Sequence, residues 1–403
     1  MGSYISAAQQ NICSIAEALV AFEKCDVRFG LVGYRDHPPQ CHTFVTIKFD
    51  FTSSPSTMRR NVDMLTTGSG GDGPESLCCG LHDTLHMDWR KESTKVVILI
   101  TDAPPHGLGE RADGFPAGCP DKRDPIAIAR KMAERGICLY TVGCEPSISK
   151  YYSFATDFMV AIANITGGQA VTLSSSHQLV DVILGGTQEE IVLERLMSEF
   201  ERERKAAVVE VNAARLARGQ RAAIMDRADE EYGMYQQEID AAVHARMTKR
   251  GVETKQLQHD ARIQTSDASK LATVANLVEW RATNPVYTRR PSQDHLFSPS
   301  GATYGASGLG VGSMHAHRFA SPGGAASGAR GFGGSSTHAH PAASSGATYG
   351  ASGRGVSNAQ AHRLFSAGAA SSPATFGVRT ASITSEQVRR MGEKSMSRGP
   401  SMS

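Results

Sequence analysis

The sequence has 403 residues and a formal net charge of +2, so its overall charge does not drive it toward nucleic acid or a membrane surface. Its 40 glycines and a charged fraction of only 20% favour about one and a half folded domains. No stretch approaches the roughly 20 apolar residues of a membrane-spanning helix. The opening residues, MGSYI, carry no basic region before an apolar run, so we expect no signal peptide and a cytoplasmic location.

The first 186 residues alternate between helical and extended patterns. Apolar residues recur at helical spacing between Ile5 and Phe22, and five consecutive apolar residues from Val96 to Ile100 are typical of a buried parallel strand. We expect strands at 27–34, 43–49, 95–102, 137–142 and 169–173, and helices near 57–65, after Pro74, at 125–135, at 151–165 and from His177. This alternation predicts an α/β domain with a doubly wound, mostly parallel sheet that binds ligands beyond the strand carboxyl ends.

All eight cysteines lie in the first 144 residues. None forms a C-x-x-C pair, and several fall inside apolar segments. We therefore predict buried, reduced thiols rather than disulfides or a zinc site.

Residues 187–281 carry dense mixed charge, and a 3-4-3-4-3 apolar spacing joins Met225, Ala228, Tyr232, Tyr235, Ile239 and Ala242. This spacing predicts a charged helical segment with a short coiled coil or helical hairpin. Self-association through the seam and packing against the first domain both remain open.

Residues 282–403 are rich in Gly, Ala, Ser and His, and residues 300–308 return almost unchanged as 345–353. Such a composition buries too little apolar surface to offset the entropy of ordering, so we predict a disordered, mildly basic tail. Association with RNA through this tail is a minor alternative, and we do not otherwise expect nucleic acid as a partner.

Three motifs in order, FGLVGYRDHPP at 29–39, GGDGPE at 70–75 and ILITDAPPHG at 98–107, resemble the intracellular von Willebrand factor A-type domains of fungi and protists. Some of those domains are attached to alpha-type kinases. The resemblance covers residues 1 to about 190.

It implies a Mg²⁺ adhesion site, with Asp102 and Asp72 as candidate ligands. The resemblance further implies that a partner carboxylate completes the coordination of the ion, which prefers oxygen ligands. We place Arg35, Asp36, His37, Glu75 and His106 on the rim of the binding face.

The first motif of that family, D-x-[ST]-x-S after the first strand, is missing, and MGSYI is similar to the segment that follows it. We therefore interpret the chain as truncated within the domain, lacking its first, central strand. On this interpretation the metal site forms only in an N-terminally complete chain.

Enzyme motifs are also missing. The chain has no G-x-x-x-x-G-K-[ST] loop and no G-x-S-x-G elbow, and residues 187–403 lack the signatures of a kinase. His106 and Cys119 are interpreted as loop residues rather than zinc ligands.

We therefore expect a non-catalytic binding or scaffold protein whose protein partner presents an acidic group. The alternative is a regulatory component of an alpha-kinase-type signalling system.

Overall fold

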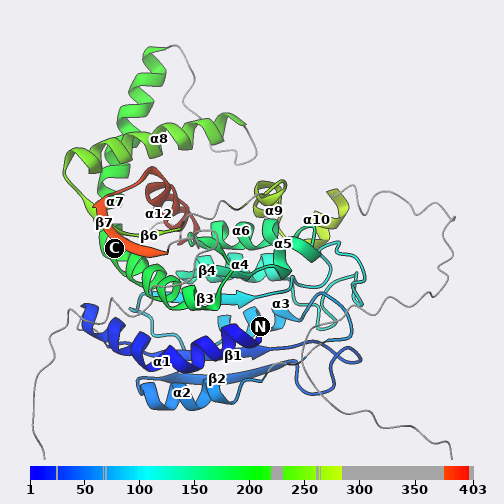
Figure 1. Cartoon of the computed structure of the whole chain (residues 1–403). Helices are drawn as coiled ribbons and strands as arrows, with labels where there is room; N and C mark the ends of the chain where they lie inside the picture. The colour runs from blue at the N-terminus through cyan, green and yellow to red at the C-terminus, as the bar shows by residue number, and fades with distance from the viewer. Residues whose placement is uncertain are drawn as a thin grey trace, which may run out of the picture. The chain divides into compact units, whose positions relative to one another are not determined.

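The computed structural model describes residues 1–23, 26–66, 68, 70–218, 230–259, 263, 265–283 and 376–398. Figure 1 shows an α/β core, a helical region that extends from it, and C-terminal elements that return to both. Among the described helices, none combines the length and the apolar character needed to cross a bilayer.

A parallel sheet forms the centre of the core. Its strands, in the order β3-β4-β5, are β3 (Lys95–Thr101), β4 (Ile137–Cys144) and β5 (Ala170–Leu173). Every residue of β4 is buried because this strand has a neighbour on each side and helices on both faces. The predicted α/β class and parallel pairing are confirmed. β3 is less buried than the apolar run predicted, since it lies at the edge of the sheet.

A second, antiparallel pair consists of β1 (Phe29–Tyr34) and β2 (Thr46–Thr52). All six residues of β1 are only partly buried. Among the described strands, β1 pairs with β2 alone and is not hydrogen-bonded to β3. The five predicted strands are thus present, but β1 and β2 belong to one sheet and β3, β4 and β5 to another.

Alternate residues of β4 enter two different cores, one on each face of the sheet. Ile137 and Leu139 pack against α3 (Leu77–Leu85), α4 (Pro125–Glu134) and α6 (Ala155–Thr166). Cys138 and Tyr140 face α1 (Gly2–Glu23) and the start of α7 (Leu179–Ala217). This period of two is what a strand buried on both faces requires. The remaining short helices of the core are α2 (Pro55–Asp63), α5 (Ser147–Tyr151) and the 3₁₀ turn η1 (Ser176–Gln178).

The predicted domain boundary at residue 186 is wrong, because α7 continues unbroken through it as a helix of 39 residues. Its second half packs against α8 (Glu230–Lys249), and Tyr235 and Ile239 are buried in this contact together with Phe200. Two residues of the predicted seam therefore pack against α7 of the same chain. Met225 and Ala228, the first two residues of the seam, lie outside the described residues.

The segment that follows α8 is not a continuation of the helical region. β6 (Glu253–Gln258) is a strand, and α9 (Ala268–Thr273) and α10 (Leu277–Thr283) pack back onto the α/β core. Leu271 and Trp280 are buried there, and the Trp280 indole donates to the Leu108 carbonyl at 3.1 Å.

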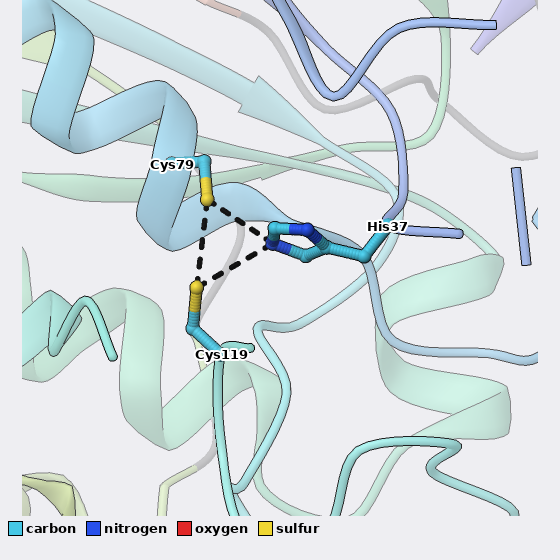
Figure 2. Close-up of side chains that lie close together, drawn as sticks. All are labelled: His37, Cys79 and Cys119. Atoms are coloured by element: carbon cyan, nitrogen blue, oxygen red, sulfur yellow. Dashed lines mark hydrogen bonds between the residues drawn. The ribbon is translucent and has the colours of Figure 1, made fainter. Parts of the chain in front are cut away.

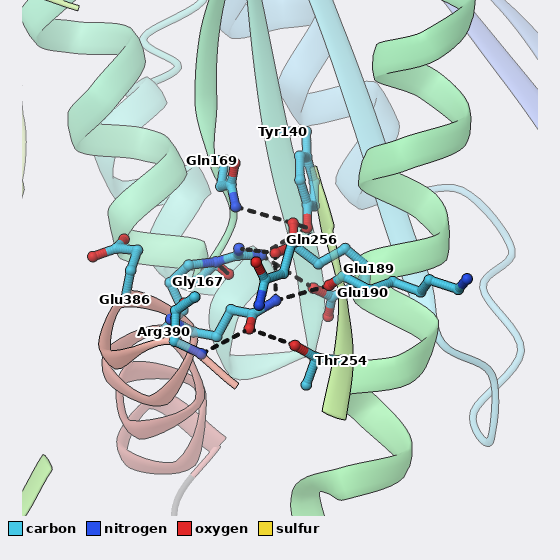
Figure 3. Close-up of polar contacts among 12 residues, drawn as sticks. Tyr140, Gly167, Gln169, Glu189, Glu190, Thr254, Gln256, Glu386 and Arg390 are labelled. Atoms are coloured by element: carbon cyan, nitrogen blue, oxygen red, sulfur yellow. Dashed lines mark hydrogen bonds and ion pairs between the residues drawn. The ribbon is translucent and has the colours of Figure 1, made fainter. Parts of the chain in front are cut away.

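The prediction of a disordered tail is wrong for its last part, while residues 284–375 lie outside the described residues. β7 (Gly377–Ser382) pairs antiparallel with β6, and α12 (Ser385–Arg398) packs against α7 and α8. Figure 3 shows the polar network beneath α12. There the fully buried Arg390 donates to the Tyr140 hydroxyl at 2.6 Å and lies 3.2 Å from the Glu189 carboxylate.

Candidate functional site

Three segments that the sequence places far apart converge at the carboxyl ends of β1 and β3. The backbone of the glycine-rich loop ties them together: Glu75 N–H donates to the Pro104 carbonyl at 2.9 Å, and Ser76 N–H donates to the Arg35 carbonyl at 3.0 Å. A backbone bridge also pairs Glu75 with Pro105. These contacts bring Asp36, Asp72, Glu75 and His106 to one edge, as the sequence predicted for the binding face.

His106 is the cation at the centre of this acidic edge. Its Nε2 lies 2.7 Å from Asp36 Oδ1 and its Nδ1 lies 2.8 Å from Asp113 Oδ1, with all three side chains almost fully buried. Burial alone lowers the pKa of the ring, but the hydrogen bonds to Asp113 and Asp36 outweigh it and raise the pKa to about 9. His106 is therefore an imidazolium at neutral pH, and both of its nitrogens donate.

Asp113 was not singled out from the sequence. Its second carboxylate oxygen accepts from Gly107 N–H at 2.7 Å, and Gly107 adopts a φ of 78°, a left-handed conformation that suits glycine. Burial raises the pKa of Asp113, but the hydrogen bonds from His106, Gly107 N–H and Phe115 N–H and the charge of His106 together outweigh it and leave the pKa below its usual range. Asp113 therefore stays ionised and holds His106 in place.

Three buried carboxylate oxygens in this cluster have no hydrogen-bond partner among the residues that the structure describes: Asp36 Oδ2, Asp72 Oδ1 and Glu75 Oε2. A Cβ atom added to Gly70 would lie 3.0 Å from Asp36 Oδ2 and 3.5 Å from Glu75 Oε1, so both carboxylates face the backbone of the glycine-rich loop. Uncompensated buried oxygens of this kind are costly unless a cation or a donor meets them.

The two carboxyl groups of the glycine-rich loop hold their protons more tightly than usual. Burial, the contact with Asp36 and the charge of Asp36 raise the pKa of Asp72 to about 6, although the Gly114 N–H, 2.5 Å away, opposes this shift. Burial and the charges of Asp36, Asp102 and Asp72 raise the pKa of Glu75 to about 8. The negative charge of the neighbouring carboxylates thus contributes to both shifts, after burial.

These residues fit a hard divalent cation. Mg²⁺ takes oxygen ligands and retains some of its water, and Asp36, Asp72 and Glu75 each offer a carboxylate oxygen without a hydrogen-bond partner among the described residues. Ligand atoms of Asp36, Asp72 and His106 lie within 4.8 Å of one another. His106 already donates through both nitrogens, so we assign it the role of holding the carboxylates.

Asp102 and Asp72, the pair predicted as metal ligands, are not in direct contact in the described residues. Asp102 Oδ2 accepts from the Met1 ammonium at 2.9 Å, and its side chain remains about one-third exposed. The charge of Asp102 still acts on Glu75. Asp36, predicted only as a rim residue, has a ligand atom within 4.8 Å of one on Asp72.

The other two predicted rim residues, Arg35 and His37, make their side-chain contacts with other parts of the chain. Arg35 ties two loops together by donating to the Thr43 hydroxyl at 2.6 Å and to the Thr66 carbonyl at 2.9 Å, and its guanidinium lies over the Phe44 ring. The His37 ring points toward the thiols of Cys79 and Cys119 (Figure 2).

Comparison with known proteins gives partial matches. No family model matches the chain. The alpha-protein kinase vwkA of Dictyostelium discoideum is 36% identical over 124 residues, which are 30% of this chain and 20% of the kinase. An ariadne-like RING finger protein of Acanthamoeba polyphaga mimivirus is 25% identical over 186 residues, 45% of this chain and 18% of that protein. The chain thus spans about a fifth of the length of the curated relatives it matches.

Proposed function

We propose that the α/β core is a von Willebrand factor A-type binding domain and that the chain is a cytoplasmic, non-catalytic binding or scaffold protein. The observation that carries the proposal is the set of partnerless buried oxygens on Asp36, Asp72 and Glu75. They lie at the carboxyl edge of β1 and β3, where open α/β sheets bind their ligands. A cytoplasmic location suits the cysteines, all free among the described residues.

In this proposal Asp72 and Glu75 hold Mg²⁺ together with Asp36, and His106 and Asp113 fix the position of Asp36. Mg²⁺ bound there would supply open coordination positions to an oxygen ligand of a partner. The partner chemistry that fits best is a carboxylate on a protein surface, because carboxylate oxygens are among the ligands that Mg²⁺ prefers.

The proposal is tested by the Mg²⁺-dependent rise in the melting temperature of the full chain. Wild type should be stabilised by millimolar Mg²⁺, since an ion that binds only the folded state shifts the unfolding equilibrium. Asp72→Asn should lose this response while keeping the acceptor for Gly114 N–H. Asp63→Asn, at the exposed end of α2, is the matched control and should respond like wild type. An equal response in all three proteins would refute the assignment.

A second candidate is a regulatory component of an alpha-kinase-type system, and the observation that favours it is the 36% identity to the Dictyostelium kinase over 124 residues. On this proposal the chain modulates a kinase in trans and carries no phosphotransfer activity of its own. Phosphate transfer from labelled ATP to protein by the purified chain, with none from the Asp72→Asn variant, would overturn the non-catalytic assignment.

A further inference from the structure

Two thiols and an imidazole nitrogen meet in the interior beside the acidic edge (Figure 2). His37 Nε2 lies 3.2 Å from Cys79 Sγ and 3.5 Å from Cys119 Sγ, and the two sulfur atoms are 3.5 Å apart. The three residues come from three segments: the end of β1, helix α3 and the long loop after β3. All three are buried, with exposed fractions of 4% for His37, 0% for Cys79 and 8% for Cys119.

We infer that His37, Cys79 and Cys119 form a zinc site. A tetrahedral zinc ion with Zn–S bonds of about 2.3 Å and a Zn–N bond of about 2.0 Å sets its ligand atoms about 3.8 Å (S to S) and about 3.5 Å (S to N) apart. The three measured separations agree with this triangle to within a few tenths of an ångström. Sulfur and imidazole donors bind zinc in preference to Mg²⁺, because Mg²⁺ takes oxygen ligands.

The surroundings supply a fourth donor. Asp121 Oδ2 lies 3.9 Å from Cys79 Sγ, within reach of an ion held between the thiols, and a water molecule is the alternative occupant of this position. Arg123 lies 3.8 Å from the Asp121 carboxylate and so orients it. The neighbouring thiol of Cys78 is buried against both Cys79 and Cys119.

Two ordinary explanations of the cluster make different predictions. A disulfide between Cys79 and Cys119 requires an S–S bond of about 2.05 Å, whereas the sulfur atoms here are 3.5 Å apart and both cysteines are free. Hydrogen bonds among the two thiols and the imidazole would also produce these distances, but they predict a folded chain without bound zinc.

A zinc ion at this point would act on the acidic edge through the backbone. His37 N–H donates to Asp36 Oδ1 at 2.6 Å, and the rings of His37 and His106 both pack edge-on against Phe115. The site therefore ties the end of β1 to α3 and to the loop that carries His106. We assign the zinc site a structural role, since a bound ion would fix the loop that ends at Cys119 against α3 and the segment after β1.

The test is the zinc content of the full chain, purified from zinc-supplemented cells and measured by inductively coupled plasma mass spectrometry. Wild type should contain about one zinc per chain, as a structural site of this ligand type does. Cys119→Ser and His37→Asn should lose most of it. Cys13→Ser, which changes a cysteine packed in a different cluster, is the matched control and should keep it. Asp72→Asn should also keep its zinc, so this result does not depend on the Mg²⁺ proposal.

A second measurement removes the ambiguity of a variant that fails to fold. X-ray absorption at the zinc edge of wild type should show two sulfur ligands at about 2.3 Å with nitrogen or oxygen at about 2.0 Å. A folded wild-type chain without zinc, a zinc shell without sulfur, or zinc fully retained by the folded Cys119→Ser variant would each overturn the inference. So would a Cys79–Cys119 disulfide found by mass spectrometry of the unreduced, zinc-free protein.

Discussion

Asp36 and His37 are neighbours in the chain, yet their side chains belong to two different polar clusters. Asp36 Oδ1 accepts from His106 Nε2 at 2.7 Å, whereas His37 Nε2 lies 3.2 Å from Cys79 Sγ. The end of β1 therefore serves both the acidic edge and the proposed zinc site. A single peptide unit connects the two clusters, and its His37 N–H donates to Asp36 Oδ1 at 2.6 Å.

The first prediction concerns His106. His106→Ala should destabilise the chain by about 3–5 kcal/mol, because it leaves the buried Asp36 and Asp113 carboxylates without their cation. His86→Ala, on the exposed end of α3, is the control and should change the free energy of unfolding by less than about 0.5 kcal/mol. Urea titrations monitored by tryptophan fluorescence would measure both values. If His106→Ala lowered the free energy of unfolding by no more than His86→Ala does, the cluster would be solvated.

The second prediction compares two adjacent arginines of α12. Arg390 is fully buried and contacts Tyr140, Glu189 and the Gly167 carbonyl, so Arg390→Ala should cost about 3–5 kcal/mol by stranding Glu189. Arg389 pairs with Glu386 and Glu393 at the more exposed surface, and Arg389→Ala should cost no more than about 1 kcal/mol. Thermal unfolding monitored by circular dichroism would rank the stabilities of the two variants. Equal destabilisation by the two substitutions would contradict the burial of the network.

The third prediction is a pH dependence of stability from Asp240 on α8. Burial raises its pKa to about 6, although Arg204 and Arg389 oppose the shift. The folded chain then binds a proton that the unfolded chain has already released, since a free Asp titrates near pKa 3.9. The stabilising contribution of the protonated carboxyl is therefore present at low pH and is lost as the pH rises through about 6.

Asp240→Asn removes this titration and provides its own control. The free energy of unfolding of wild type minus that of the variant should fall by roughly 1 kcal/mol between about pH 5 and about pH 7.5, a value reduced for the partial exposure of the side chain. Urea titrations of both proteins at each pH would give this difference. If the difference stayed constant or grew with pH, Asp240 would be ionised in the folded chain.

The sequence predicted the central elements because their apolar periodicity is local. The run from Val96 to Ile100 identified β3, and helix α4 was placed to within one residue. β6 and β7 were missed because their sequences, ETKQLQ and GVRTAS, show no apolar alternation, and their partners lie far apart in the chain. The burial of Arg390 depends likewise on distant acidic residues of α7, which no local pattern of α12 reveals.

The sequence indicated which residues belong to the candidate site. It did not indicate which of these residues contact one another. Strand ends and the glycine-rich loop pointed to Asp36, Asp72, Glu75 and His106, which the structure gathers. Cys119 was weighed as a zinc ligand with His106, but its neighbours are His37 and Cys79. The side on which each loop residue points depends on backbone turns such as the one at Gly107, and these leave no periodic signal in the sequence.

Electron paramagnetic resonance of Mn²⁺ tests divalent cation binding at the acidic edge most directly. Mn²⁺ takes the same oxygen ligands as Mg²⁺ and loses its sharp free-ion signal when it binds a protein. We predict one Mn²⁺ bound per wild-type chain, displaced by excess Mg²⁺, and none bound at this edge in an Asp72→Asn, Glu75→Gln double variant that remains folded. An unattenuated free-ion signal with wild type, or binding by the double variant equal to that of wild type, would contradict the account.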